Sequence, residues 1–485
     1  MDEPKPAAAG AHPALPALRL DAEGRRHVDM RAVAALALPL VLNSTIQAVL
    51  SLTDTWFIGR LSVDATAALG AVYWFVILAL LLFGGATMAV QTLVAQAYGG
   101  RRYRRASRAL WTGLWASLVT VPLFAAAILA GPGLVGVFGL DPAITVLAVD
   151  YWQPRLAGGP FAAALWALSA YFNGVGRTRL PLLVTSVVAV SNVVLNEWLI
   201  FGLGMGVAGA AWATTLAQCL GVGLAMVLML RLEPQRYRPL ATWRPRLPAI
   251  RSQLLLGIPM AATASADLLG SALFQVMQVR IGAVDGAATM IVMMFTSLAY
   301  MPGIGVALAG TTLVGQAIGA GDREWANVLG SRIIRLVSLG MGGLGLVMAL
   351  AGSLLVPLFV NDSDGNAAAT IALALKLLWI AAVYQFFDGL NFASSFCLRG
   401  AGDVRVPALL VMGLGFGLFV PLCYLLSFAP GQGWFVGRYD VPSIVLGAGL
   451  GAVGGWLSLL LYCMLAGAVL LLRWRQGAWR AIRLR

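Results

Sequence analysis

The sequence is poor in charge and almost without histidine. Of its 485 residues only 11% are charged and 60% are hydrophobic, whereas an ordinary soluble domain carries about 25% charged residues. This composition excludes a soluble globular protein. The two histidines, His12 and His27, both lie near the N-terminus, outside every long apolar run. The apolar runs therefore offer no histidine for a membrane-embedded catalytic or metal centre, and we expect neither enzymatic activity nor a cofactor.

Cysteine is also scarce. Cys219, Cys397, Cys423 and Cys463 lie within apolar runs, at none of the spacings that bind metals. We expect them to be small packing residues. Residues 1–30 are rich in alanine, proline and charge and lack the apolar core of a cleavable signal peptide, so we expect a flexible cytoplasmic extension there.

Long apolar runs occupy most of the chain. A helix needs about 20 apolar residues to cross the hydrocarbon core of a bilayer, where every backbone polar group must be satisfied internally. The sequence therefore predicts an all-α, polytopic membrane protein with twelve transmembrane helices. The predicted spans are 31–58, 64–97, 108–133, 144–172, 180–202, 206–231, 252–280, 286–318, 329–359, 369–398, 405–428 and 442–472.

The formal net charge of +13 follows the predicted topology. With these spans, 28 of the 33 Lys and Arg residues fall in the two termini and in the loops after even-numbered spans. The positive-inside rule then places both termini in the cytoplasm, including a basic tail at 474–485. We expect a multi-pass protein of the bacterial inner membrane whose basic residues set topology and contact anionic lipid, and which binds no nucleic acid.

An internal repeat divides the chain. Three motifs return in the same order: ALPL (37–40) as GIPM (257–260), TLVAQAYGG (92–100) as TLVGQAIGA (312–320), and GRTRLPLLV (176–184) as GDVRVPALL (402–410). Each half carries six spans, so both halves have the same orientation. We predict two pseudo-symmetric six-helix lobes around a central cleft, an N-lobe at 31–232 and a C-lobe at 251–473, joined by a cytoplasmic linker at 233–250. We expect such lobes to move against each other. The alternative is that the duplication reflects ancestry alone and that the lobes do not move.

Two aspartates of the second half lie inside apolar runs. Asp388 shares one helix face with Tyr384, Asn391 and Ser395 and precedes Arg399, where the chain is expected to meet water again. A carboxylate at this depth costs roughly 2.5–3.5 kcal/mol, which points to a working role.

Asp267 lies on another helix of the same lobe. The two carboxylates are expected to share a proton or to bind a hard cation such as Na⁺, with Tyr384 and Asn391 as further ligands. The alternative is a hydrogen-bonded pair that only holds two helices together.

The first half offers a second polar cluster. Asp54 and Gln47 lie on one helix face, and Asn192, Asn196 and Thr214 come from the fifth and sixth spans. We predict a small polar pocket around Asp54. The alternative is that Asp54 is solvated at the membrane interface.

The eighth span carries Met290, Met293, Met294 and Tyr300. Flexible thioethers suit a surface that accepts varied apolar ligands, so these residues are candidates for lining a substrate path. The alternative is that they are ordinary core or lipid-facing side chains.

Several motifs together resemble the multidrug and toxic compound extrusion (MATE) family, in particular its NorM-like branch. They are LALPLVLNSTIQAVLSLTDTWFIGRLSVDATAALGA, TLVAQAYGG, NGVGRTRLPLLV, NVVLNEWLIFG and GVAGAAWATT in the first half, and LGIPMAATASADLL and RGAGD in the second. The resemblance covers residues 31–472. It implies two six-helix lobes that open alternately to either side of the membrane.

The resemblance also implies residue roles. Asp54 matches the acidic residue tied to proton coupling and drug release, and Tyr384 and Asp388 match positions that hold the coupling cation. Asp267 stands where the NorM-like branch tends to carry glutamate. Asn196 stands where another branch carries aspartate, which favours the second lobe as the cation site.

The expected function is antiport. Na⁺ or H⁺ enters, and an amphipathic, often cationic, organic compound leaves in exchange, with the protein acting as a monomer. A flippase for lipid-linked saccharide is the alternative. Its cleft would need several basic residues to bind pyrophosphate, but the spans hold very few, mainly Arg155 and Lys376.

Overall fold

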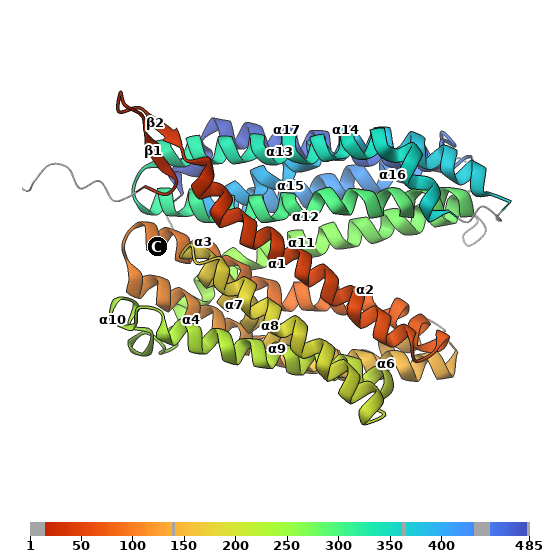
Figure 1. The fold of residues 1–485 in the computed structure, drawn as a ribbon, viewed down its shortest axis with the longest axis horizontal. Helices are drawn as coiled ribbons and strands as arrows, with labels where there is room; N and C mark the ends of the chain where they lie inside the picture. Colours follow the sequence, from red (N-terminus) through yellow and green to blue (C-terminus); the bar gives the residue numbers. More distant parts are fainter. Residues whose placement is uncertain (1–14, 138–140, 361–364, 431–446, 483–485) are drawn as a thin grey trace, which may run out of the picture.

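The computed structural model describes residues 15–137, 141–360, 365–430 and 447–482. The outer parts of the two predicted tails, 1–14 and 483–485, lie outside this range, as does the predicted start of the last span at 442–446. Within the described part the chain is a bundle of long helices with one small hairpin (Figure 1).

The first half begins with the strands β1 (Leu18–Leu20) and β2 (Arg26–Val28). Its helices are α1 (Met30–Gly59), α2 (Val63–Gly84), α3 (Ala89–Gly99), α4 (Tyr103–Val119), α5 (Val121–Gly136), α6 (Pro142–Ala157), α7 (Gly159–Gly174), α8 (Arg179–Asn196) and α9 (Gly206–Arg231). A 3₁₀ turn, Gly85–Met88, joins α2 to α3, and a π-helical turn, Glu197–Gly202, extends α8.

A linker with the short helices α10 (Pro234–Tyr237) and Pro239–Ala241 leads to the second half. The helices there are α11 (Leu247–Ile281), α12 (Ala283–Gly319), α13 (Arg323–Leu355), α14 (Ala367–Ala401), α15 (Arg405–Leu414), α16 (Val420–Ser427) and α17 (Gly451–Gln476). Short turns of 3₁₀ or π geometry follow α13, α15 and α17 at Val356–Phe359, Gly415–Phe419 and Ala478–Ala481.

Twelve membrane-spanning segments follow from these elements. Within the described ranges, eleven helical segments are each long and apolar enough to cross a bilayer. The twelfth is the pair α6–α7, which breaks where Gly158, Gly159 and Pro160 follow one another. Each of its two helices has only 16 residues, and Pro160 cannot donate a backbone hydrogen bond to the preceding turn. The predicted span 144–172 is therefore present but bent.

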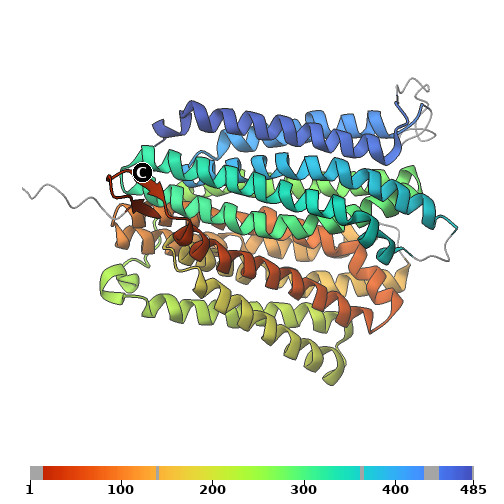
Figure 2. The same ribbon diagram turned by 45° about the horizontal axis from the view of Figure 1, so that its top comes forward.

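The helices form two lobes that lie side by side in both views (Figures 1 and 2). Each lobe has its own buried apolar clusters, one pair made by the helices up to α9 and another by α11–α17. The first helix is shared: Val33 of α1 belongs to a cluster of the second lobe, whereas Phe57 and Ile58 belong to the first. The fold predicted from the sequence is the one observed.

The chain between residues 15 and 29 differs from the expected flexible extension. β1 and β2 pair as an antiparallel hairpin, and Arg26 forms a 2.6 Å ion pair with Asp322, at the start of α13. The Trp325 indole donates to the Pro16 carbonyl oxygen at 2.9 Å. The hairpin is therefore bound to the second lobe, because a buried tryptophan and an acidic helix cap provide its partners.

The repeat places matching glycines at the contact between the lobes. A Cβ atom at Gly99 of α3 would lie 1.9 Å from the carbonyl oxygen of Gln316 in α12. The repeat counterpart behaves alike, since a Cβ atom at Gly319 would lie 2.0 Å from the carbonyl oxygen of Gln96. Only glycine permits this approach of two helix backbones.

Hydrogen bonds across the same contact are also duplicated. In each case a side chain of TLVAQAYGG or its repeat donates to a backbone carbonyl of the other lobe: Gln96 to Gly400 (3.0 Å), Gln316 to Gly174 (2.9 Å), Thr92 to Arg399 (2.9 Å) and Thr312 to Asn173 (3.1 Å). The two lobes are thus joined by a pseudo-two-fold set of contacts.

These contacts lie near one end of the bundle. That end carries the α3–α4 turn with Arg101, Arg102, Arg104 and Arg105, and we call it the arginine-rich end. The hairpin and the end of α17 lie there too (Figure 1).

Candidate functional site

Asp388 is the most enclosed carboxylate of the predicted site. It lies in the middle of α14 and only 6% of its surface is exposed. The side chains of Tyr384 and Asn391, one turn away on either side, face it, and the thiol of Cys463 on α17 lies 3.7 Å from its Oδ1 atom. Three uncharged groups therefore surround a carboxylate inside a membrane-spanning helix.

Asp267 lies beside a small cavity in the same lobe. The cavity has a volume of about 20 Å³ and is lined from α11, α14 and α15 by Thr263, Asp267, Asn391, Phe392, Ser395, Phe396, Arg399 and Val411. A space of this size holds one water-sized occupant.

Asn391 connects the two aspartates. It faces Asp388, and it also lines the cavity beside Asp267. Its amide oxygen is buried and has no hydrogen-bond partner within the described part of the chain. A buried acceptor left unsatisfied costs about 1–3 kcal/mol, so a small donor or a cation in the cavity would relieve it.

Arg399 does not meet open water as the sequence suggested. It is partly buried, lines the cavity with Asp267, and its guanidinium carbon lies 4.6 Å from the centre of the Phe396 ring. A positive charge therefore already faces Asp267. Asp267 and Asp388 differ accordingly, because the first has a charged neighbour across the cavity and the second has uncharged ones.

Asp54 of the first lobe is held by a hydrogen-bond network in which the Asn196 amide oxygen has no partner among the described residues. Asn196 donates to its Oδ1 at 2.8 Å and Thr214 to its Oδ2 at 3.0 Å. Asn196 also donates to Asn192 at 3.1 Å, and Asn192 to Thr214 at 3.2 Å. Asn192 and Asn196 are fully buried. The fifth and sixth spans thus bring together with Asp54 the three polar residues expected there.

Gln47 is not part of this network. It is exposed on α1, two turns before Asp54, and its backbone carbonyl accepts from the Ser51 hydroxyl of the same helix at 3.2 Å. Helical spacing placed Gln47 and Asp54 on one face, but the side chains of α8 and α9 that bond this face bond Asp54.

The methionine cluster divides between two environments. Met290 and Met294 are 65% and 56% exposed, whereas Met293 packs against the apolar core of the second lobe. Tyr300 is half-buried, with its ring 4.9 Å from that of Phe392.

The exposed pair continues a helix face that meets the other lobe nearer the arginine-rich end. A Cβ atom at Gly305 of α12 would lie 2.6 Å from the backbone nitrogen of Val41 in α1. Met294 precedes Gly305 by eleven residues, three helical turns, so both lie on one face of α12. That face is covered by α1 at Gly305 and exposed at Met294.

Two residues that lie near the carboxylates, an arginine and a cysteine, were not expected there from the sequence. Arg155 of α6, only 9% exposed, donates to Gln218 at 3.4 Å, and its charge acts on Asp54. Cys463, expected to be a packing residue, contacts Asp388. The position of Arg155 inside an apolar run was the one signal that could have found it. No such signal in the sequence marked Cys463.

Residues 39–198 and 259–425 match the MatE family. These segments start at Pro39 and Pro259, the two prolines related by the repeat. The chain belongs to the MatE family. This confirms the family predicted from the motifs.

Similar proteins of this family are named for drug resistance. A probable multidrug resistance protein NorM of Mesorhizobium japonicum is 32% identical over 464 residues, which cover 92% of this chain and 93% of that protein. The multidrug resistance protein NorM of Burkholderia vietnamiensis is 32% identical over 453 residues, with 91% and 92% covered. The MatE-family chain therefore matches these relatives over nearly their whole length.

Solved structures share the fold. A MATE crystal structure in complex with MaL6 has a TM-score of 0.79 at 20% identity and covers 93% of this chain and 97% of its own. The outward-facing conformation of a multidrug resistance MATE family transporter of the MOP superfamily has a TM-score of 0.77 at 19% identity, with 93% and 96% covered. Twelve helices in two lobes are the architecture of this family.

Proposed function

We propose that this MatE-family protein is an antiporter of the bacterial inner membrane that exchanges Na⁺ or H⁺ for amphipathic, often cationic, organic compounds. The observation that carries the proposal is a separate carboxylate centre within the membrane-spanning helices of each lobe, Asp54 in one and Asp267 with Asp388 in the other. A protein that only sealed or braced a membrane would gain nothing from such costly groups. The drug-resistance names of its relatives support a transport role and not an enzymatic one.

The second lobe supplies the better cation site. Carboxylate, amide and hydroxyl oxygens are the ligands that hard cations prefer, and Asp267, Asn391, Ser395 and Thr263 all line one small cavity. The unpartnered amide oxygen of Asn391 is the acceptor that an entering Na⁺ or hydronium would satisfy. Asp388 adds negative charge next to it.

Arg399 gives this site two states. In the absence of a coupling ion its guanidinium offsets the charge of Asp267 across the cavity. A cation that enters competes with Arg399 for the carboxylate. Because Thr92 of the other lobe donates to the Arg399 backbone carbonyl, this competition is connected to the contact between the lobes.

The first lobe supplies a proton or substrate site. Both oxygens of Asp54 accept from uncharged donors, so a proton that neutralises Asp54 must rearrange Asn196 or Thr214. Neutral Asp54 no longer attracts a cationic compound, which favours its release.

Alternating access follows from the contacts between lobes. They join the lobes at the arginine-rich end, which we assign to the cytoplasm by the positive-inside rule. The α12 face exposed at Met290 and Met294 then lies on the outer half of the membrane and lines the substrate path. The coupling ion drives the exchange only if it binds one lobe arrangement more tightly than the other; a full shift from 1:99 to 99:1 needs roughly 5.5 kcal/mol of such preference.

Lipid-linked saccharide transport remains the second candidate. It would use basic side chains in the path to bind pyrophosphate. Arg155 is buried against Gln218, and Lys376 is exposed on α14, so no pair of cations converges there among the described residues, and antiport is favoured.

The test is transport in proteoliposomes with the purified protein. Efflux of a fluorescent organic cation such as ethidium is measured under an imposed Na⁺ gradient and, separately, a pH gradient. We expect one of the two gradients to drive flux of the organic cation. Without an imposed gradient, the same compound should move slowly. Flux under neither gradient, together with transbilayer movement of a labelled lipid-linked saccharide, would overturn antiport in favour of the flippase.

A further inference from the structure

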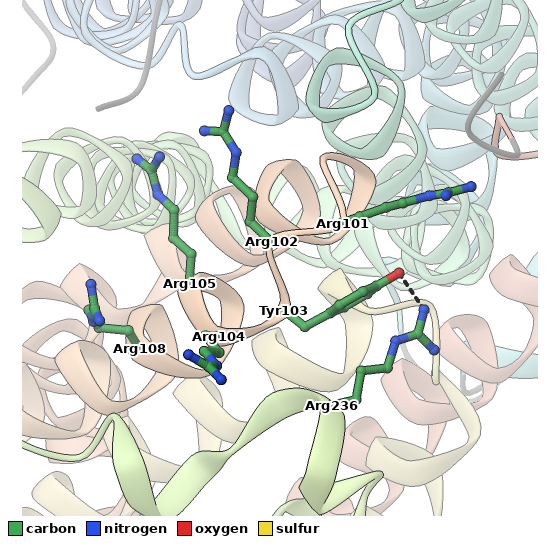
Figure 3. Close-up of a pocket in the computed structure, with 7 residues that line it drawn as sticks. All are labelled: Arg101, Arg102, Tyr103, Arg104, Arg105, Arg108 and Arg236. Atoms are coloured by element: carbon green, nitrogen blue, oxygen red, sulfur yellow. Dashed lines mark hydrogen bonds between the residues drawn. The ribbon is translucent and has the colours of Figure 1, made fainter. Parts of the chain in front are cut away.

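A cavity lies at the arginine-rich end, outside the carboxylate centres. It has a volume of about 460 Å³ and is lined by Arg101, Arg102, Tyr103, Arg104, Arg105, Arg108 and Arg236. Figure 3 shows Arg102 and Arg105 extending in the same direction from the α3–α4 turn, with Tyr103 and Arg236 facing each other beside it. Its volume lies within the range of about 300–1,000 Å³ that is usual for ligand sites.

The lining is cationic, since six of its seven residues are arginines. Among the described residues that line the cavity none carries a carboxylate. Glu233, next to it, accepts from Arg236 at 2.8 Å and from Arg177 at 3.2 Å. The hydrogen bond from Arg236 lowers the pKa of Glu233, so this carboxylate stays charged and offsets the charge of Arg236 on the α10 side of the cavity.

The repeat counterpart of this turn has the opposite charge. Asp322 precedes α13 as Arg102 precedes α4, and the two residues are 220 positions apart. Their backbone N–H groups make equivalent hydrogen bonds: Asp322 donates to the Ala317 carbonyl oxygen at 3.1 Å, and Arg102 donates to that of Ala97 at 2.8 Å. Asp322 accepts from the Trp325 backbone N–H at 2.8 Å and binds Arg26.

α4 lacks such a cap and starts instead with cations, against the preference of a helix N-terminus for negative charge. An anion in the cavity would supply what Asp322 supplies in the other lobe.

The surroundings place this cavity beside an apolar surface. On α4 the face of Arg104 and Arg108 continues through Trp111 and Trp115 to Leu118, which is 54% exposed. A ligand with a charged head and long apolar chains would extend along this face.

The linker extends the same apolar surface. The indoles of Trp111 and Trp115 donate to the linker carbonyls of Pro239 and Trp243 at 2.9 and 2.7 Å. The linker in turn exposes Trp243, which is 46% exposed, and Leu240, which is 72% exposed. Tryptophan and leucine next to arginines are typical of a segment at the membrane surface.

We propose that this cavity binds the phosphate-rich headgroup of an anionic membrane lipid, with two phosphates held by bidentate arginine contacts and the acyl chains along α4. Arginine forks match phosphate oxygens better than lysine does, and basic pockets at the cytoplasmic ends of membrane helices suit such headgroups. The inference does not rest on the proposed transport function.

Native mass spectrometry of the detergent-purified full-length protein tests it. The protein is titrated with a four-chain diphosphatidylglycerol lipid, with phosphatidylcholine, and with inorganic triphosphate as the soluble polyphosphate. We expect the diphosphatidylglycerol lipid to bind at least about tenfold more tightly than phosphatidylcholine. In the variant Arg104→Lys/Arg108→Lys, which keeps charge and hence topology, this preference should fall by about fivefold.

The control is Arg244→Lys/Arg246→Lys, which changes two exposed linker arginines that do not line the cavity. Its lipid preference should equal that of the unmodified protein. An equal loss in both variants would mean that the charge acts diffusely and would overturn the site. Tight binding of triphosphate that is lost in the cavity variant, without a lipid preference, would overturn the lipid as its ligand.

Discussion

The two lobes share a helical frame but not a carboxylate site. By the offset of 220, Asp54 of the first lobe corresponds to Phe274, a buried core residue, and Asp267 of the second, which is exposed, corresponds to the exposed amide Gln47. The repeat therefore reproduced the contacts that join the lobes and left the polar centres to diverge. The frame and the chemistry of this protein are separable.

The two centres also differ in the space beside them. Among the described residues, Asn196 of the first lobe and Asn391 of the second each have a buried amide oxygen without a hydrogen-bond partner. Both oxygens of Asp54 accept hydrogen bonds, whereas Asn391 and Asp267 line a small cavity. Because that cavity gives an ion room beside a carboxylate, we expect cation coupling to depend more on the second lobe than on the first.

The substitution Asp388→Asn breaks the comparison most strongly. It removes the charge of the most enclosed carboxylate while keeping its shape, and charge-assisted contacts are worth about 1.5–3 kcal/mol. We expect gradient-driven efflux of ethidium from proteoliposomes to fall by about 100-fold. Asp285→Asn is the matched control, since Asp285 accepts a structural bond from the Ala452 backbone N–H at 2.7 Å and lies outside the cavity lining. Undiminished flux in Asp388→Asn would place coupling elsewhere.

Asn391→Leu sharpens the comparison within the second lobe. The change removes the unpartnered acceptor and leaves both aspartates in place. The concentration of coupling cation that gives half-maximal flux should rise by about tenfold, with a smaller effect on the maximal rate. Ser394→Ala, a buried neighbour on α14 outside the cavity lining, should not change that concentration. If both variants shift it equally, Asn391 acts through packing alone.

Asp54→Asn tests the first lobe. The new amide keeps one oxygen that can accept from Asn196 or Thr214, so the hydrogen-bond network is weakened but not lost. We expect about a fivefold loss of flux, with an unchanged half-maximal concentration of coupling cation, because that cation binds in the other lobe. An equal shift in that concentration would show that the two centres act as one.

Gly99→Ala addresses the shared frame. Its Cβ atom would collide with the Gln316 carbonyl oxygen, so the lobes must separate slightly at the arginine-rich end. In a background lacking Cys219, Thr312→Cys should react about threefold faster with a membrane-impermeant thiol reagent when Gly99→Ala is added. Gly343→Ala on α13, where a Cβ atom would meet open space, should have no effect. If Gly99→Ala changed the affinity for the coupling cation but left the reactivity of Thr312→Cys unchanged, Gly99 would not act through the contact between the lobes.

The amino-acid sequence by itself determined the number of spans, their assignment to two lobes and the family. Length of apolar runs and the repeat of motifs are local or periodic signals that need no knowledge of packing. The same signals identified Asp54, Asn192, Asn196 and Thr214, because buried polar residues in spans have few uses. Even the bent span α6–α7 was detectable as an apolar run.

Tertiary structure alone decided which polar residues meet. Helical spacing put Gln47 with Asp54, but Asn196 of α8 and Thr214 of α9 bond Asp54, and Gln47 is exposed. It could not pair Asp267 with Arg399, Asp388 with Cys463, or Arg26 with Asp322, because each of these contacts joins segments far apart in the chain. Their geometry depends on how whole helices pack, which no single segment encodes.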